Sequence, residues 1–196
     1  MPAAASESSD EELMLAYAAG DAAAFDSLYA RHKGGVYRYL LRQSHDARIA
    51  DEMFQDVWMS VIRTRVRYEV AAKFTTWLYR IAHNRLIDHY RAAGHMNLVS
   101  ADDDEHTELV NDVAAGPTLE PEHRAEQREL GDRLQTALKA LPYVQREAFL
   151  LQQEGGLSLD EVAELTGAGR ETVKSRLRYA VAKLRNALED LREDAG

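Results

Sequence analysis

The 196-residue sequence contains no cysteine, which excludes disulfides, thiolate metal sites and a catalytic thiol. It has no apolar run long enough to span a membrane. Its first residues, MPAAASESSDEE, have neither the basic start nor the apolar centre of a signal peptide. These absences predict a soluble, cytoplasmic protein without membrane insertion.

The sequence also lacks an excess of basic residues, because 24 Lys and Arg face 33 Asp and Glu, for a net charge of −9. Taken as a whole, this charge argues against a general nucleic-acid binder. The charges are segregated, however. Residues 63–91 and 170–186 are strongly basic, whereas residues 101–132 hold eleven acids and two arginines. Such asymmetry is more informative than the total.

No convincing alternating strand pattern appears, and helical periodicity dominates the chain. We therefore predict an all-α fold of two small helical domains joined by a flexible acidic linker. Asp21 is a candidate N-cap, and Gly34-Gly35 falls inside the helix that follows, which should weaken it by roughly 1 kcal/mol per glycine. The predicted boundaries are a disordered tail over 1–10, a first domain over 11–95, a linker over 96–124 and a second domain over 125–192.

The clearest local signal lies in residues 157–185, LSLDEVAELTGAGRETVKSRLRYAVAKLR. Ser158 and Glu161 form a capping-box pattern, Gly167 permits a turn, and a basic second helix begins near Arg170. This layout is typical of a DNA-binding helix-turn-helix, although an ordinary helical hairpin with a solvated basic face has the same pattern. Its outer face holds donors and acceptors suited to bases and phosphates: Arg170, Glu171, Thr172, Lys174, Ser175, Arg178 and Tyr179.

Two further segments have compositions that suit macromolecular partners. In FTTWLYRIAHNRLIDHYR, residues 74–91, aromatic, cationic and amide side chains suit unstacked bases and phosphates. The competing interpretation is that Phe74, Trp77 and Tyr79 are core residues and the arginines are merely solvated. In ADEMFQDVWMSVI, residues 50–62, one side of the helix is acidic and bears a methionine, which suits either a partner or solvent.

These segments occur in the order AGDAAAFDSLYARH, ADEMFQDVWMSVI, FTTWLYRIAHNRLIDHYR and LPYVQREAFLL…GLSLDEVAELTGAGRETVKSRLR. Together they resemble the two-domain, extracytoplasmic-function (ECF) subfamily of bacterial RNA polymerase sigma factors of the sigma-70 family. The resemblance implies that the first domain is sigma region 2, which binds core RNA polymerase and the minus-10 promoter element. It implies that the second is sigma region 4, a helix-turn-helix that binds the minus-35 element, and that an anti-sigma factor regulates the protein.

The resemblance also assigns roles to residues of this chain. The polymerase-docking helix corresponds to Asp51, Glu52, Gln55, Asp56 and Met59. The loop 65–73 corresponds to one that holds a base flipped from the non-template strand. The minus-10 and strand-opening positions are Arg65, Arg67, Lys73, Trp77, Tyr79, Arg80, Asn84, Asp88 and Arg91. In the recognition helix for the minus-35 element the matching positions are Lys174, Ser175 and Arg178.

Two other classes of protein, a conventional repressor and an enzyme, fit the sequence less well than a sigma factor does. A conventional helix-turn-helix repressor would act as a dimer on palindromic sites, but it leaves the acidic helix over 50–62 without a role. An enzyme is disfavoured because the sequence has no HExxH, no P-loop, no nucleophile elbow and no dinucleotide fingerprint in a strand context. We therefore expect neither catalysis nor a cofactor, and no metal site.

Overall fold

The computed structural model describes residues 8–94 and 131–193, and within these ranges every regular element is a helix. The all-α prediction is therefore confirmed. No helix in the described ranges is long and apolar enough to cross a membrane. The elements are α1 (Asp10–Ala18), α2 (Ala22–Ser44), α3 (Ala47–Thr64), the short 3₁₀ helix η1 (Arg65–Arg67), α4 (Phe74–Ala92), a helix over 131–139, α7 (Tyr143–Gly155), α8 (Leu159–Thr166) and α9 (Arg170–Glu193).

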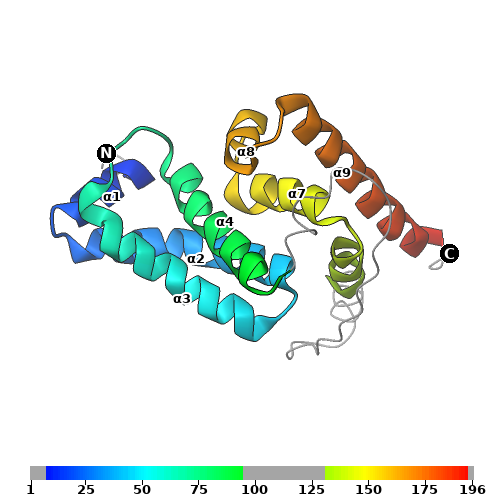
Figure 1. Ribbon diagram of the computed structural model, residues 1–196, viewed down its shortest axis with the longest axis horizontal. Helices are drawn as coiled ribbons and strands as arrows, with labels where there is room; N and C mark the ends of the chain where they lie inside the picture. Colours follow the sequence, from blue (N-terminus) through cyan, green and yellow to red (C-terminus); the bar gives the residue numbers. More distant parts are fainter. Residues whose placement is uncertain (1–7, 95–130, 194–196) are drawn as a thin grey trace, which may run out of the picture.

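Helices α1 to α4 form a first group, the N-terminal bundle (residues 8–94), on the left of Figure 1. Asp21 caps α2 by accepting from the Ala23 N–H, as predicted, and Asp46 caps α3. Helices α2, α3 and α4 meet around fully buried side chains that include Leu28, Val57 and Leu86. This apolar contact fixes which faces of α3 and α4 remain for partners.

The sequence analysis did not identify helix α1, which begins at Asp10, the last residue of the predicted tail, and continues into the predicted first domain. Ser9 caps it, and a reciprocal hydrogen bond from the Ser9 N–H to Glu12 completes a capping box. Glu11, the second residue of α1, accepts a 2.7 Å hydrogen bond from the Phe74 N–H at the start of α4. Lys73 at that helix start provides no side-chain cap, so α1 supplies the cap from a distance.

The glycine pair Gly34-Gly35 does lie inside α2, and the helix is continuous through it. A Cβ atom on Gly35 would lie 2.8 Å from the Tyr79 hydroxyl and 3.0 Å from the Glu154 carbonyl oxygen. Any side chain at position 35 would therefore hold α7 away from α2. The weak helix former at this position is explained by close approach of the two helices.

The helix over 131–139 and helices α7 to α9 form the C-terminal bundle (residues 131–193). The predicted capping box of Ser158 and Glu161 is present at the start of α8. Gly167 ends α8 in the left-handed conformation, with φ of +69°, and α9 begins at Arg170 as expected. Val162 and Val173 are buried between α8 and α9, which makes this pair a helix-turn-helix.

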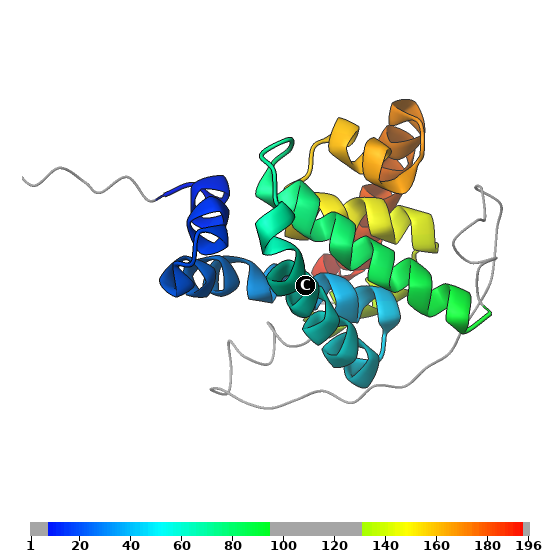
Figure 2. The ribbon, with the colours of Figure 1, turned by 60° about the vertical axis from the view of Figure 1, so that its left-hand side comes forward.

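The two bundles pack against each other. Helix α7 lies along α2 and α4, and α8 lies beside the first half of α4 (Figures 1 and 2). The sequence analysis predicted two domains but not this contact. The predicted linker, residues 96–124, lies outside the described residues.

The cap that α1 provides for α4 leads to a stability prediction. Glu11→Ala removes the acceptor for the Phe74 N–H, and loss of a helix cap typically costs about 1 kcal/mol. We expect the free energy of unfolding, measured by urea denaturation, to fall by about that amount. Glu69→Ala, which removes an exposed carboxylate from the loop before α4, is the matched control. Equal stability of the two variants would contradict the capping role.

Candidate nucleic-acid interface

The acidic face of α3 is turned away from the interior of the N-terminal bundle. Met53, Val57 and Val61 on the opposite side of the helix are buried. Met59 is a large apolar side chain with 43% of its surface exposed. The sequence-predicted docking residues that lie exposed on this face are Asp51, Glu52, Gln55, Asp56 and Met59.

A second surface is formed by α4 and the end of α3, around a pocket of about 380 Å³. Trp77 forms one wall, half-buried against Tyr68 and Phe74. Asn84 is exposed beside it. The pocket combines an aromatic ring, an amide and two guanidinium groups with a carboxylate, and its lining is Ser60, Thr64, Arg67, Trp77, Ile81, Asn84, Arg85 and Asp88. Such a lining can stack on a base and hydrogen-bond its edges.

Other predicted residues of α4 differ in their surroundings. Arg91 is exposed and pairs with Asp88 one turn earlier, at 3.3 Å. Tyr79 is 1% exposed, and its ring packs 5.4 Å from that of Tyr39 in the interior. Burial raises the pKa of Tyr79. Of the two interpretations offered for this aromatic, the core interpretation describes its position, because the side chain faces α2 and α7.

The loop 65–73 leads from α3 into α4 along the edge of this surface. Arg65 donates to the Ile62 carbonyl oxygen and lies over the ring of Tyr17 from α1. Val66 and Val70 are highly exposed for apolar side chains. The loop therefore presents apolar and basic groups to solvent next to the pocket.

The predicted contact residues of the helix-turn-helix lie on α9 at exposed or half-buried positions. Arg170 pairs with Asp160 at 3.1 Å, and Lys174 pairs with Glu171 at 3.6 Å, so both cations are held near the surface. Arg178 lies over the ring of Tyr179. Thr172 and Ser175 are half-buried.

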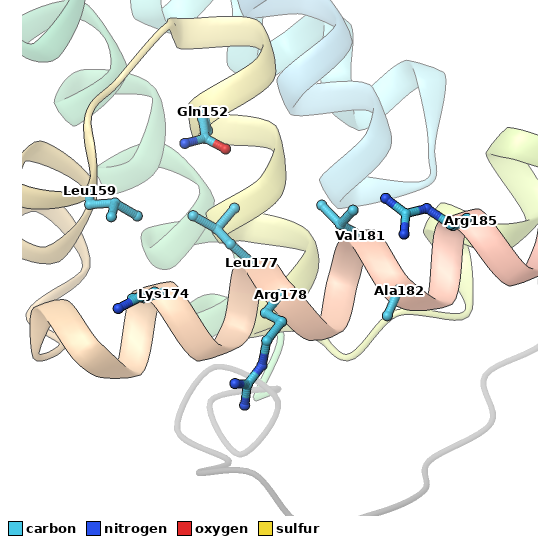
Figure 3. Close-up of a pocket in the computed structure, with 8 residues that line it drawn as sticks. All are labelled: Gln152, Leu159, Lys174, Leu177, Arg178, Val181, Ala182 and Arg185. Carbon is cyan, nitrogen blue, oxygen red and sulfur yellow. The ribbon is translucent and has the colours of Figure 1, made fainter.

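A groove of about 440 Å³ runs along α9 and is drawn in Figure 3. Leu177 and Val181 point towards α7, where Gln152 lies, and Arg178 projects from the opposite side of α9 (Figure 3). Lys174 and Arg185 border the groove near its ends. The basic groups of α9 thus flank an apolar strip instead of forming one continuous basic surface.

Several contacts made by residues at the edge of these surfaces were missed in the sequence analysis. They lie where the C-terminal bundle meets the N-terminal bundle. Lys73 pairs with Glu161 at 3.4 Å, and Arg80 pairs with Glu164 at 2.6 Å. The only local signal was that acids on the short helix α8 could complement a basic patch elsewhere in the chain. Further residues of this contact are Gln43, Thr76, His83, Tyr143, Arg146, Glu147 and Glu154.

One carboxylate at this contact has a strongly altered acidity. Partial burial alone would raise the pKa of Glu161, but hydrogen bonds from Ser158 and Thr76 and the charge of Lys73 lower it to about 2. Glu161 is therefore an anion at neutral pH. It serves at once as a cap for α8 and as an acceptor for groups on α4.

Comparison with known families gives two matches that follow the two bundles. Residues 28–95 match the model of sigma-70 region 2, and residues 131–184 match a model of sigma-70 region 4. The first domain begins earlier in the structure than the first match, because α1 precedes it.

Curated relatives cover almost the whole chain. The ECF RNA polymerase sigma factor SigM of Mycobacterium tuberculosis is 34% identical over 182 residues, covering 93% of this chain and 86% of the relative. SigK of Mycobacterium bovis, another ECF RNA polymerase sigma factor, is 32% identical over 189 residues, covering 93% and 95%.

Two solved structures share the fold. One is CnrH in complex with the cytosolic domain of CnrY, with a TM-score of 0.64 at 23% identity, covering 93% of this chain and 99% of the other. The second is the sigma factor RpoE of Bartonella quintana in complex with the anti-sigma factor NepR, with a TM-score of 0.60 at 21% identity, covering 84% and 96%. With both region models matched and relatives aligned over nearly the full length, this chain belongs to the ECF family of RNA polymerase sigma factors, which direct the polymerase to promoters for transcription initiation.

Proposed function

We propose that the three exposed surfaces divide the work of promoter recognition. The acidic face of α3 docks on core RNA polymerase, the pocket of α4 with the loop 65–73 holds the opened minus-10 strand, and α9 reads the minus-35 element. The observation that carries this proposal is the pocket beside Trp77 and Asn84, because it joins a stacking ring to polar groups on an exposed surface.

The α4 pocket suits separated strands better than duplex DNA. A base can stack on Trp77 only after it leaves its own helix, and stacking on an aromatic contributes about 1–3 kcal/mol. That energy is enough to trap a transiently unpaired base but not to melt a duplex unaided. The role of this surface is therefore to stabilise strands that polymerase helps to separate, and the chemistry of RNA synthesis belongs to polymerase.

The distribution of charge supports dependence on polymerase. Non-specific affinity for DNA comes mostly from neutralising phosphates, and a chain with a net charge of −9 has little of it. Two basic surfaces on separate bundles bind DNA strongly only when both are aligned on one promoter. Polymerase docked on α3 would provide that alignment.

We also propose a cytoplasmic location and an anti-sigma partner. Both solved relatives are complexes with a second protein, and in one of them a sigma factor is bound to a protein that is named an anti-sigma factor. The exposed apolar groups on α9, with cations beside them, offer a surface for such a partner. Proteins that co-purify with this chain from native extract would identify the anti-sigma partner.

The first functional prediction concerns polymerase binding. Reversing both charges with Asp51→Lys and Glu52→Lys should weaken binding to core polymerase about tenfold or more, because complementary charges at an interface become repulsive. Both side chains are exposed, so the fold should be retained. Competition against labelled wild-type protein for core polymerase measures the effect.

The matched control carries Asp26→Lys and Asp132→Lys, which change the net charge by the same amount at exposed positions elsewhere. This control should compete like the wild type. If the α3 variant also competes like the wild type, the acidic face of α3 is not the docking surface.

The second functional prediction concerns strand opening. Asn84→Ala and Arg80→Ala should each reduce open-complex formation about fivefold or more, since each removes a group that would contact an unpaired strand. Permanganate footprinting of holoenzyme measures opening, on a promoter selected by transcription of a genomic library with reconstituted holoenzyme. Core binding and helical content should not change.

Lys33→Ala removes a cation from α2, away from the pocket, and should leave opening intact. Trp77 is a poor probe because its half-buried ring also packs against Phe74 and Tyr68. Undiminished opening in both the Asn84 and the Arg80 variants would mean that this face of α4 is structural.

A further inference from the structure

The first turns of α4 are covered by α8 of the C-terminal bundle. The Glu161 carboxylate accepts a 2.8 Å hydrogen bond from the Thr76 hydroxyl and lies 3.4 Å from Lys73 Nζ. One turn further along α4, Arg80 Nη2 lies 2.6 Å from Glu164. Two carboxylates of the helix-turn-helix thus pair with cationic side chains at one edge of the proposed minus-10 surface.

A buried contact beneath these ion pairs holds the two bundles together. Tyr79 of α4 packs between α2 and α7, where a Cβ on Gly155 would lie 3.2 Å from its ring. Beside it, Glu147 accepts hydrogen bonds from Tyr143 and from Nδ1 of His83, both within 2.9 Å. Arg146 Nε donates to the Gln43 side chain at 2.9 Å. Buried polar side chains of the two bundles therefore hydrogen-bond to each other.

The two layers of this contact have different roles. The Glu164 side chain is 70% exposed, and exposed ion pairs contribute at most about 1 kcal/mol. The attraction between the bundles must come from the buried layer, where apolar area and hydrogen bonds are removed from water together. The outer ion pairs then determine which cations of α4 are occupied once the bundles have closed.

We propose that the free chain inhibits itself: α8 covers the first turns of α4 at the edge of the minus-10 surface, with Glu161 and Glu164 in the places of DNA phosphates, until the C-terminal bundle moves away. The inference rests on the proposed role of α4 in binding the opened strand. It predicts that single-stranded DNA and α8 compete for Lys73, Thr76 and Arg80.

The closed arrangement leaves the acidic face of α3 exposed, including Glu52 and Met59. Polymerase can therefore dock before the C-terminal bundle moves, whereas DNA cannot fully occupy α4 until it has moved. This gives an order of events in which polymerase binds first and promoter DNA second. A free chain would not be held on DNA by its basic residues.

Neighbouring glycines of α2 provide a matched pair of variants for the test. Gly35→Ala places a methyl group 3.0 Å from the Glu154 carbonyl oxygen and 2.8 Å from the Tyr79 hydroxyl, which should separate the bundles. Gly34→Ala meets only the end of the flexible Arg38 side chain, at 3.1 Å. Both substitutions favour α2 equally by helix propensity, so only the contact between the bundles distinguishes them.

Two measurements on the full-length chain read the outcome. The chain has no cysteine, so Ala30→Cys and Asn186→Cys at exposed positions allow spin labels on the two bundles without competing thiols. Gly35→Ala should lengthen and broaden the distance distribution, and Gly34→Ala should leave it narrow. Fluorescence anisotropy with a labelled random-sequence single-stranded oligonucleotide should show about tenfold tighter binding for Gly35→Ala if the closed state holds nine-tenths of the wild-type chain.

Glu164→Arg provides a second variant that leaves the buried core untouched. It places a like charge against Arg80 and should also broaden the distance distribution, by less than Gly35→Ala. Only the distance is read for this variant, because an added cation would itself favour DNA. Thermal melting, monitored by circular dichroism, checks that each variant remains folded.

Distinct results would overturn the inference. A broad wild-type distribution identical to that of Gly35→Ala would mean that the free chain is not held closed. A distribution that opens in Gly35→Ala without any gain in oligonucleotide affinity would mean that α8 does not mask a DNA-binding surface. Permanganate footprinting of the Asn84 variant tests the role of the α4 pocket separately, so a failure of masking is distinguishable from a failure of the proposed function.

Discussion

The arrangement of this molecule depends on the buried contact of α7 with α2 and α4. Arg146 and Glu147 are adjacent charged residues on α7 and are only 7% and 3% exposed. Buried charges need hydrogen-bond partners. Within the C-terminal bundle Tyr143 donates to Glu147 and the Leu141 carbonyl oxygen accepts from Arg146, and across the contact His83 and Gln43 add one partner to each. When the bundles separate, water can replace these partners. A contact that is partly polar can therefore open without exposing a wholly apolar surface, as suits a reversible one.

Protonation of Glu161 is a poor means of releasing α8 from α4. The pKa of Glu161 is lowered in the folded chain to about 2, so the stabilisation it provides is fully present above its ordinary value of 4.5. That stabilisation is lost only as the pH falls from about 4.5 towards 2. Near neutrality the carboxylate stays charged and must be displaced by a competing anion or withdrawn by movement of α8. A DNA phosphate near Lys73 would be such a competitor, which links opening to promoter binding.

Sequence reasoning succeeded where a feature depends on residues near each other in the chain. The caps at Asp21 and Ser158, the turn at Gly167 and the start of α9 at Arg170 follow from local hydrogen bonding and backbone preference. It missed α1, although Ser9 and Glu12 have the same capping-box spacing as Ser158 and Glu161. The pattern was overlooked because α1 is short and its apolar periodicity is weak.

The contact between the bundles could not be predicted in the same way. No local sequence pattern shows that His83 will contact Glu147 or that Gln43 will contact Arg146, because these residues are far apart in the sequence. Helical periodicity reports only on residues a few positions apart. Tyr79 was placed with the DNA-facing residues by the family resemblance, and the composition of its helix alone left both interpretations open. On a helix with aromatic residues on several sides, composition does not show which aromatic is covered by a distant segment, and α7 covers this one.

The glycines at the contact show how such a constraint can still influence the sequence. Gly35 lies inside a 23-residue helix, where glycine costs about 1 kcal/mol relative to alanine. Within the N-terminal bundle alone, only the Tyr79 hydroxyl would restrict a side chain there, and the Glu154 carbonyl oxygen of the other bundle adds the second restriction. A Cβ on Gly155 would lie 3.2 Å from the ring of the same tyrosine. Gly34 has no comparable backbone neighbour, so nothing in the contact explains it. A helix weakened at Gly35 to admit α7 is the expected result when closure of the two bundles contributes to function.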